Sequence, residues 1–248
     1  MAEILLKDGE RINQLFSTDV KIIQNREVFS YSVDSVLLSR FPNLPKRGLI
    51  VDLCAGNGAV GLFASTRTKA QIIAVEIQER LADMAQRSIE LNGLTHQMQV
   101  IQDDLKYLTR YISGSKVDMI LCNPPYFKVD EHSNLNASRH YLLARHEIAT
   151  NLEEICQISQ RVLKSNGRLT MVHRPERFLD IIETMTAHNL APKRIQFVYP
   201  KANRKANMLL IEAIKDGSRD GLKILPPLFI HNQDGSYTPE IHEIYYGK

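Results

Sequence analysis

The chain has 248 residues, a formal net charge of +3 and a sequence pI near 8.7. This length is sufficient for one α/β domain with a sizeable core, and the mildly basic balance permits an anionic partner without requiring one. No run approaches the roughly 18 consecutive apolar residues of a membrane helix, and the first residues lack the basic-then-apolar layout of a signal peptide. We therefore expect a cytoplasmic protein with one main domain.

Cysteine and histidine usage gives little support for a disulfide framework or a metal site. The three cysteines are far apart and form no paired motif: Cys54, Cys122 and Cys156. They are expected to be buried thiols. Three histidines in one polar stretch lack the i, i+4 spacing and the cysteine partners of a metal site: His132, His140 and His146. No metal is expected.

The first 47 residues differ in style from the rest of the chain and are expected to form a separate N-terminal segment that caps the cofactor site, with the main domain over 48–248. Short apolar runs occur at 21–24 and 28–31, and a short helix is predicted from about Asp34 through Leu38.

From Gly48 onward, short apolar runs alternate with helical patterns, which is typical of crossover units in a parallel sheet. Five strands are predicted, at 49–53, 71–75, 98–101, 119–122 and 169–172. One helix is predicted from Gln78 to a stop at Asn92-Gly93, and another from about Asn151 through Leu163 to Asn166-Gly167.

The last third of the sequence predicts two final strands, at 194–199 and 207–213. A lysine-rich connector joins them, and they are expected to pair antiparallel. The expected fold is therefore a Rossmann-like α/β fold, with a seven-stranded, mostly parallel sheet flanked by helices and an antiparallel last strand. Residues 127–146 show no clear periodicity, and long connections of this kind are usually functional or mobile.

A glycine loop connects the first strand of the main domain to a helix. Gly56, Gly58 and Gly61 have the G-x-G-x-x-G spacing, which lets backbone approach a ligand closely at the start of a helix. The spacing alone is a weak signal. It fits a dinucleotide whose pyrophosphate faces the helix N-terminus, and it also fits a tight turn without a ligand.

Acidic residues at the ends of three consecutive strands favour a nucleoside cofactor. Glu76 can accept hydrogen bonds from ribose hydroxyls, and Asp104 or Asp103 can accept one from an adenine amino group. Asp52 lies ahead of the glycines, where its carboxylate can hold the amino end of a methionine moiety but would be repelled by the like charge of a pyrophosphate. A structural role, in which Asp52 caps the glycine turn, is the alternative. We therefore expect S-adenosylmethionine as cofactor. The candidate contacts are Asp52, Gly56, Gly58, Glu76, Ile77, Asp104, Leu105 and Asn123.

The fourth strand runs into Asn123-Pro124-Pro125-Tyr126, the candidate catalytic residues. A conjugated amino group is a poor nucleophile because its lone pair is delocalised. The Asn123 side-chain oxygen and the Pro124 carbonyl could accept both of its hydrogens and aim the lone pair at a methyl donor, while Tyr126 stacks on the flat substrate.

The same four residues are also adequate as a strand-ending turn without catalytic use. Strand alternation should point Cys122 away from Asn123, so Cys122 is expected in the core and not as a nucleophile.

These motifs together resemble the class I S-adenosylmethionine-dependent amino methyltransferases, over about residues 48 to 215. The opening of the chain, with Glu10-Arg11-Ile12, Ile22-Ile23-Gln24 and the run from Phe29 to Leu38, resembles the bacterial tRNA(Val) adenine-N6 methyltransferase family. That resemblance implies an adenosine beside the anticodon as target, and the cofactor roles given above for Asp52, Glu76 and Asp104. The tail from Gly221 to Lys248 is not assigned.

Four substrate classes fit the clamp: adenine in DNA, adenine in RNA, guanine N2 in ribosomal RNA, and a protein glutamine. DNA enzymes usually carry a further recognition domain, and only about thirty residues follow the last predicted strand near Ile214. Release-factor enzymes need a helical domain ahead of the catalytic one, and residues 1–47 are short for that. RNA is therefore the expected partner, and the family resemblance implies that this RNA is a tRNA. A cofactor-binding module without turnover and a nicotinamide dehydrogenase remain as alternatives from other classes.

Basic residues in two places could line an approach for phosphates. They are Arg139 and Arg145 in the long loop, and Lys193, Arg194, Lys201, Arg204 and Lys205 around the last hairpin. A solvated charged hairpin is the alternative.

Overall fold

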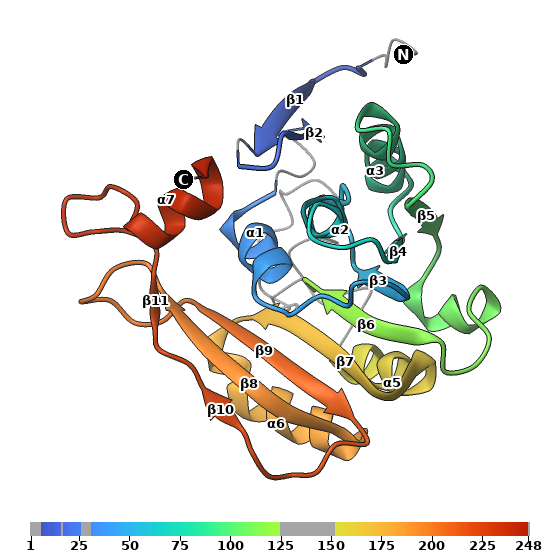
Figure 1. Ribbon diagram of the computed structural model, residues 1–248, viewed down its shortest axis with the longest axis vertical. Coiled ribbons are helices and arrows are strands. Elements are labelled where there is room, and N and C mark those ends of the chain that lie inside the picture. Colours follow the sequence, from blue (N-terminus) through green and yellow to red (C-terminus); the bar gives the residue numbers. More distant parts are fainter. Residues whose placement is uncertain (1–5, 16, 26–30, 125–151, 248) are drawn as a thin grey trace, which may run out of the picture.

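The computed structural model describes residues 6–15, 17–25, 31–124 and 152–247 (Figure 1). Within these residues the main sheet has nine strands, in the order β10-β8-β9-β7-β6-β3-β4-β5, with β11 also paired to β8. Its seven longer strands are β3 (Leu49–Leu53), β4 (Gln71–Glu76), β5 (Met98–Gln102), β6 (Val117–Cys122), β7 (Leu163–His173), β8 (Leu190–Tyr199) and β9 (Met208–Lys215).

The sheet is parallel from β5 across to β7, and β9 runs antiparallel between β7 and β8. The expected α/β fold, with a mostly parallel sheet and an antiparallel last strand, is confirmed. Two short strands join it that the sequence did not predict, β10 (Lys223–Ile224) and β11 (Leu228–Phe229), both parallel to β8. They belong to the unassigned tail, which runs along β8.

Alternate residues of each central strand enter two different hydrophobic clusters, one on each face of the sheet. Ile50 and Met119 belong to one cluster, and their neighbours Val51 and Ile120 belong to the other. This burial on both faces is why the strands appear in the sequence as continuous apolar runs.

Helices cover both faces of the sheet (Figure 1). They are α1 (Val33–Arg40), α2 (Ala59–Ser65), α3 (Glu79–Leu91), α5 (Leu152–Val162) and α6 (Phe178–Ala187). A further helix, α7 (Pro239–Tyr246), lies beside the N-terminal part of the chain (Figure 1). The predictions of α1 and α3 are confirmed. In α3 the chain leaves the helix through Gly93, whose φ of 67° suits glycine.

The helix α5 ends earlier than predicted. It stops at Val162, because Leu163 is fully buried and already pairs with Val117 at the start of β7. Asn166, with φ 64°, therefore lies in the irregular first part of a strand and not at a helix terminus.

The N-terminal part of the chain forms a separate two-stranded antiparallel hairpin, β1 (Glu10–Leu15) and β2 (Val20–Asn25), where the sequence indicated an apolar run at 21–24 but not β1. The hairpin lies beside α3, and its turn meets the C-terminal helix: Ser17 N–H donates to the Tyr245 carbonyl at 3.0 Å (Figure 1). The division of the chain at residue 47 stays a prediction. Among the described residues, no helix is long and apolar enough to cross a membrane.

Candidate active site

The carboxyl ends of the central strands bring the candidate residues to one edge of the sheet. Leu53 of β3 pairs with Val75 of β4 on one side and with Cys122 of β6 on the other. The next residues along these strands, including Glu76 and Asn123, therefore lie at the same edge. Open α/β sheets bind ligands at this edge.

The glycine loop between β3 and α2 needs its glycines for conformation and for space. Gly56 and Gly58 have φ values of 57° and 81°, in the left-handed region. A Cβ on Gly58 would lie 3.1 Å from the Cβ of Ala85 in α3, so a side chain there would also crowd that helix. Cys54, ahead of the glycines, has φ 56°, an uncommon value for a residue with a side chain.

Asp52 is fully buried and uses only one of its two carboxylate oxygens in hydrogen bonds within the described part of the chain. Oδ2 accepts the N–H of Gly61 in the first turn of α2 at 2.8 Å, so the capping role considered for Asp52 is present. Oδ1 is buried and has no hydrogen-bond partner among the described residues. Burial raises the pKa of Asp52 to about 7, against the Gly61 hydrogen bond and with a further contribution from the charge of Glu76.

Glu76 braces the glycine loop from the end of β4. Its Oε2 accepts the N–H of Gly56 at 2.8 Å, and its Oε1 accepts the N–H of Gln78 at 2.9 Å. Burial raises its pKa, although these hydrogen bonds oppose the shift. Each carboxylate oxygen keeps a second lone pair, so hydroxyl groups of a ligand can still be accepted. Beside it, Ile77 is 42% exposed, an apolar surface at the same edge.

The two acidic residues after β5 accept hydrogen bonds from residues that follow them closely in the chain. Asp104 Oδ1 accepts the N–H of Lys106 at 3.0 Å and so caps the short helix η1 (Leu105–Arg110). Asp103 Oδ2 accepts the Tyr111 hydroxyl at 2.9 Å. Leu105 packs into the same hydrophobic cluster as Val51.

The Asn123-Pro124 pair directly follows β6. Asn123 Nδ2 donates to Ser35 Oγ of α1 at 3.3 Å, and Pro124 is buried. Pro125 and Tyr126 lie outside the described residues. Cys122 is in the core as expected, and burial, with a contribution from Cys54, raises its thiol pKa well above its ordinary value.

Two residues at this edge were not singled out by the sequence. Ser35 lies within the N-terminal run whose helix was predicted, but nothing in its spacing pointed to Asn123. Asn57 occupies the variable position between Gly56 and Gly58; its Nδ2 donates to the Ile23 carbonyl at 2.9 Å, and its buried Oδ1 has no hydrogen-bond partner among the described residues. The sequence signal that could have indicated Asn57 is its polar amide side chain within a glycine loop.

The basic residues of the last hairpin separate into two groups. Lys193 donates to the Ser218 carbonyl at 2.6 Å, and Arg194 lies 4.6 Å from the Phe41 ring centroid, so both are engaged within the chain. The other three lie in the connector after β8: Lys201, Arg204 and Lys205. Lys201 also donates from Nζ to the Gln233 carbonyl, at 3.3 Å, whereas Arg204 and Lys205 have exposed side chains. Because β8 runs parallel to β7, this connector lies at the same edge as the glycine loop. Arg139 and Arg145, like His132, His140 and His146, lie outside the described residues.

The residues at this edge fit S-adenosylmethionine. The unpaired buried oxygen of Asp52 can accept from an ammonium group, the Glu76 carboxylate from ribose hydroxyls, and Ile77 can pack on a flat base. An acidic residue before the glycines would be unfavourable beside a pyrophosphate.

An α/β fold with acidic residues at consecutive strand ends is typical of enzymes that bind a nucleoside cofactor. Comparison with known families gives the class of this chain. Residues 19–188 match the family described as methyltransferase small domain, and the chain belongs to that family. Family membership confirms the expected enzyme class, a methyltransferase, and its expected cofactor, S-adenosylmethionine.

Relatives with assigned activities are similar over most of the chain. A tRNA1(Val) (adenine(37)-N6)-methyltransferase of Shewanella sp. (strain MR-7) is 25% identical over 214 residues, covering 86% of this chain and 89% of the relative. The protein of that description from Bacteroides fragilis (strain YCH46) is 26% identical, with the same coverage. Among solved structures, a predicted O-methyltransferase from Agrobacterium tumefaciens, protein Atu636, superposes with a TM-score of 0.68 at 24% identity, covering 87% of this chain and 96% of that one. This last likeness shows the fold.

Proposed function

We propose that this methyltransferase acts on the exocyclic N6 amino group of an adenine in RNA, in a tRNA near the anticodon. The observation that carries the proposal is the position of Asn123, at the end of β6 and one strand away from Asp52 and the glycine loop, with its amide held by Ser35. The relatives described as tRNA1(Val) (adenine(37)-N6)-methyltransferases support the choice of substrate. A tRNA substrate implies a cytoplasmic location.

Each proposed cofactor contact has a separate task. Asp52 holds the ammonium group through Oδ1, Gly56 and Gly58 allow the close backbone approach, and Glu76 accepts from the ribose hydroxyls. Ile77, Asp104, Leu105 and Asn123 complete the set, with Asp104 the proposed acceptor for the adenine amino group. The cofactor supplies an electrophilic methyl group.

The proposed catalytic residues are Asn123, Pro124, Pro125 and Tyr126. The Asn123 side-chain oxygen and the Pro124 carbonyl accept the two hydrogens of the target amine and direct its lone pair. Tyr126 stacks on the adenine. No residue with a tuned pKa is required as a base, because the proton leaves after the nitrogen has become cationic. Catalysis by this clamp is mainly positioning.

The test is methyl transfer from labelled S-adenosylmethionine to separate pools of unmodified tRNA, ribosomal RNA, DNA and release factor. The products are identified by nucleoside mass spectrometry for the nucleic acids and by peptide mass spectrometry for the release factor. We expect label in tRNA as N6-methyladenosine. Label as N2-methylguanosine in ribosomal RNA, as N6-methyladenine in DNA, or on a protein glutamine would each replace the proposed substrate with the corresponding alternative.

A further inference from the structure

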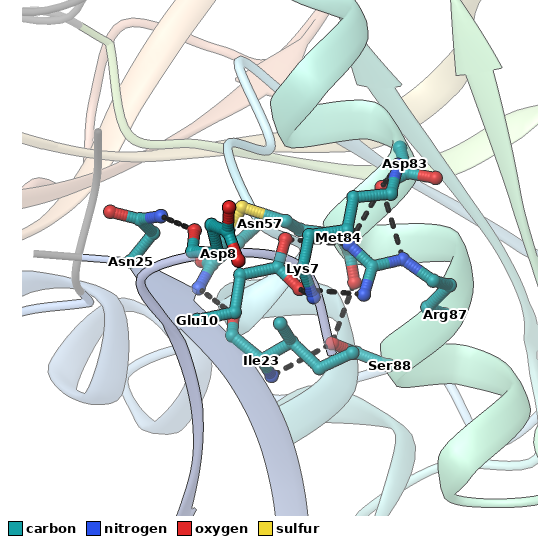
Figure 2. Close-up of polar contacts among 10 residues, drawn as sticks. All are labelled: Lys7, Asp8, Glu10, Ile23, Asn25, Asn57, Asp83, Met84, Arg87 and Ser88. Atoms are coloured by element: carbon teal, nitrogen blue, oxygen red, sulfur yellow. Dashed lines mark hydrogen bonds and ion pairs between the residues drawn. The ribbon is translucent and has the colours of Figure 1, made fainter. Parts of the chain in front are cut away.

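The N-terminal hairpin is fixed to α3 by a buried ion pair. The Arg87 guanidinium donates from Nη1 to Glu10 Oε2 and from Nη2 to Glu10 Oε1, both at 2.7 Å, and its Nε donates to Asp83 Oδ2 at 3.0 Å (Figure 2). The Glu10 side chain is fully covered and that of Arg87 is 14% exposed. Burial alone would raise the pKa of Glu10, but hydrogen bonds from Arg87 and from the Lys7 N–H outweigh it and lower that pKa, so the pair is ionised.

The second strand of the hairpin, β2, connects α3 to the glycine loop through the backbone of Ile23. The Ile23 N–H donates to Ser88 Oγ of α3 at 3.0 Å, and the Ile23 carbonyl accepts Nδ2 of Asn57 at 2.9 Å. Ser88 itself donates to the Met84 carbonyl at 2.7 Å, which sets the direction of its lone pairs (Figure 2). The Ile23 side chain packs on Leu81 and Met84 of α3.

The contact with Ile23 determines how the Asn57 amide is oriented. The amide is planar, so committing Nδ2 to the Ile23 carbonyl fixes where Oδ1 points. Oδ1 is buried, Asn57 is fully buried as a whole, and among the described residues no donor reaches Oδ1. A buried acceptor without a donor is costly, so such an atom indicates a ligand or an ordered water.

We infer that Asn57 Oδ1 is a further contact to the cofactor, accepting from one of its N–H or O–H groups, and that the hairpin is the element that positions it. The inference rests on the proposed assignment of the glycine loop to S-adenosylmethionine. Glu10 and Arg87 are positioning residues in this arrangement: they hold β2 against α3, and β2 holds the Asn57 amide.

This arrangement predicts that displacing the hairpin changes the affinity for the cofactor but not the turnover number. If the hairpin is displaced, the Ile23 carbonyl no longer holds Nδ2, and the Asn57 amide can rotate away from its binding orientation. Asn123 directly follows β6 and its amide donates to Ser35 of α1, and neither of these contacts involves Glu10. Hairpin variants should therefore weaken cofactor binding while kcat at saturating cofactor is kept.

The experiment is a double-mutant cycle on the full chain, with the S-adenosylmethionine Kd measured by calorimetry and kcat measured at saturation. The variants are Asn57→Ala, Glu10→Lys, which opposes Arg87 with a like charge, and the double variant; Glu10→Gln serves if Glu10→Lys does not fold. Lys7→Ala is the matched control, because it removes only the exposed ion pair of Lys7 with Asp83 on the same face. Thermal melts identify variants that are simply unfolded.

We expect Asn57→Ala to weaken binding by up to about tenfold, as the loss of one buried hydrogen bond would. Glu10→Lys should weaken it by a comparable or smaller factor, Lys7→Ala should leave it unchanged, and the double variant should bind like Asn57→Ala alone. Unchanged affinity in Asn57→Ala would assign Oδ1 to a water and overturn the inference, and so would additive effects in the double variant. A wild-type protein that binds S-adenosylmethionine but methylates no tRNA would overturn the substrate proposal alone.

Discussion

The side-chain amide of Asn123 is joined to α1 by a hydrogen bond from its Nδ2 to Ser35 Oγ, at 3.3 Å. Ser35 is 2% exposed, so its hydroxyl does not have bulk water as a competing partner. The hydrogen bond fixes the nitrogen end of the amide towards α1, and therefore also the direction in which the oxygen end points. The N-terminal segment thus contributes to the geometry of the proposed clamp.

Ser35→Ala should lower kcat about fivefold while the S-adenosylmethionine Kd stays unchanged, because it removes a hydrogen bond, worth about 1 kcal/mol, that helps to orient the Asn123 amide. Steady-state kinetics at saturating cofactor, with calorimetry for the Kd, measure both. Ser39→Ala is the matched control: Ser39 is also a buried serine of α1, but its hydroxyl donates to the Val36 carbonyl. An equal loss of kcat in both variants would mean that α1 is perturbed as a whole.

Asn123→Ala should abolish methyl transfer, because it removes the side-chain oxygen that we propose as acceptor of an amine hydrogen. Cofactor binding should be largely kept, since Asp52, Glu76 and the glycine loop are untouched. A transfer assay paired with calorimetry on the same preparation checks the two halves of this prediction. Retained transfer would leave Asn123 as a strand-ending turn residue.

Cofactor affinity should fall as the pH is lowered below 7. Burial raises the pKa of Asp52 to about 7, and an ammonium group binds only its carboxylate form. With that pKa, the affinity at pH 6 should be about eightfold weaker than at pH 7.5, measured by calorimetry. Asp52→Asn should bind weakly and with little pH dependence over this range. If the wild-type Kd did not change over this pH range, Asp52 would not be the residue that binds the ammonium group.

The stability of the cofactor-free protein should have the opposite pH trend. The folded-state pKa of Asp52 lies above the ordinary value of 3.8, so its stabilising contribution is fully present below that value and is lost as the pH rises through about 7. Asp52→Asn removes this dependence. Relative to the wild type, its Tm should therefore rise between pH 5 and pH 8. Glu76, whose pKa is also raised by burial, is unchanged in this comparison.

The strands and the edge they define could be predicted from the sequence because each central strand is buried on both faces. Ile50 and Val51 enter opposite clusters, and this produces the continuous apolar run at 49–53. The positions of Asp52, Glu76 and Asn123 at strand ends follow from those runs, since parallel strands end at one edge.

The contacts between segments far apart in the sequence could not be predicted. Glu10 and Arg87 are 77 residues apart, and their pairing depends on how the hairpin docks on α3. The side chains of β1 are half-buried along most of its length, and their burial alternates only weakly between neighbours. No clear period therefore marks this segment as a strand. The tail was missed because its two-residue strands are too short for any period, although β11 is held by pairing with Val198 and Tyr199 of β8.

Changing Lys201, Arg204 and Lys205 together to Ala should weaken tRNA binding and reduce its dependence on salt. These residues belong to the connector at the carboxyl edge of the sheet, and each phosphate contact to a single strand contributes about 0.7 to the slope of log affinity against log salt. Three lost contacts should therefore lower the slope by about 2, measured by filter binding between about 50 and 200 mM salt, in the range where that relation holds. The matched control changes three exposed basic residues that precede β3 and β4, at the opposite edge: Lys46, Arg47 and Lys69. If both triple variants lowered the slope equally, RNA binding would reflect the net charge of the protein; if only the connector variant did, the RNA would approach the edge that holds Asn123.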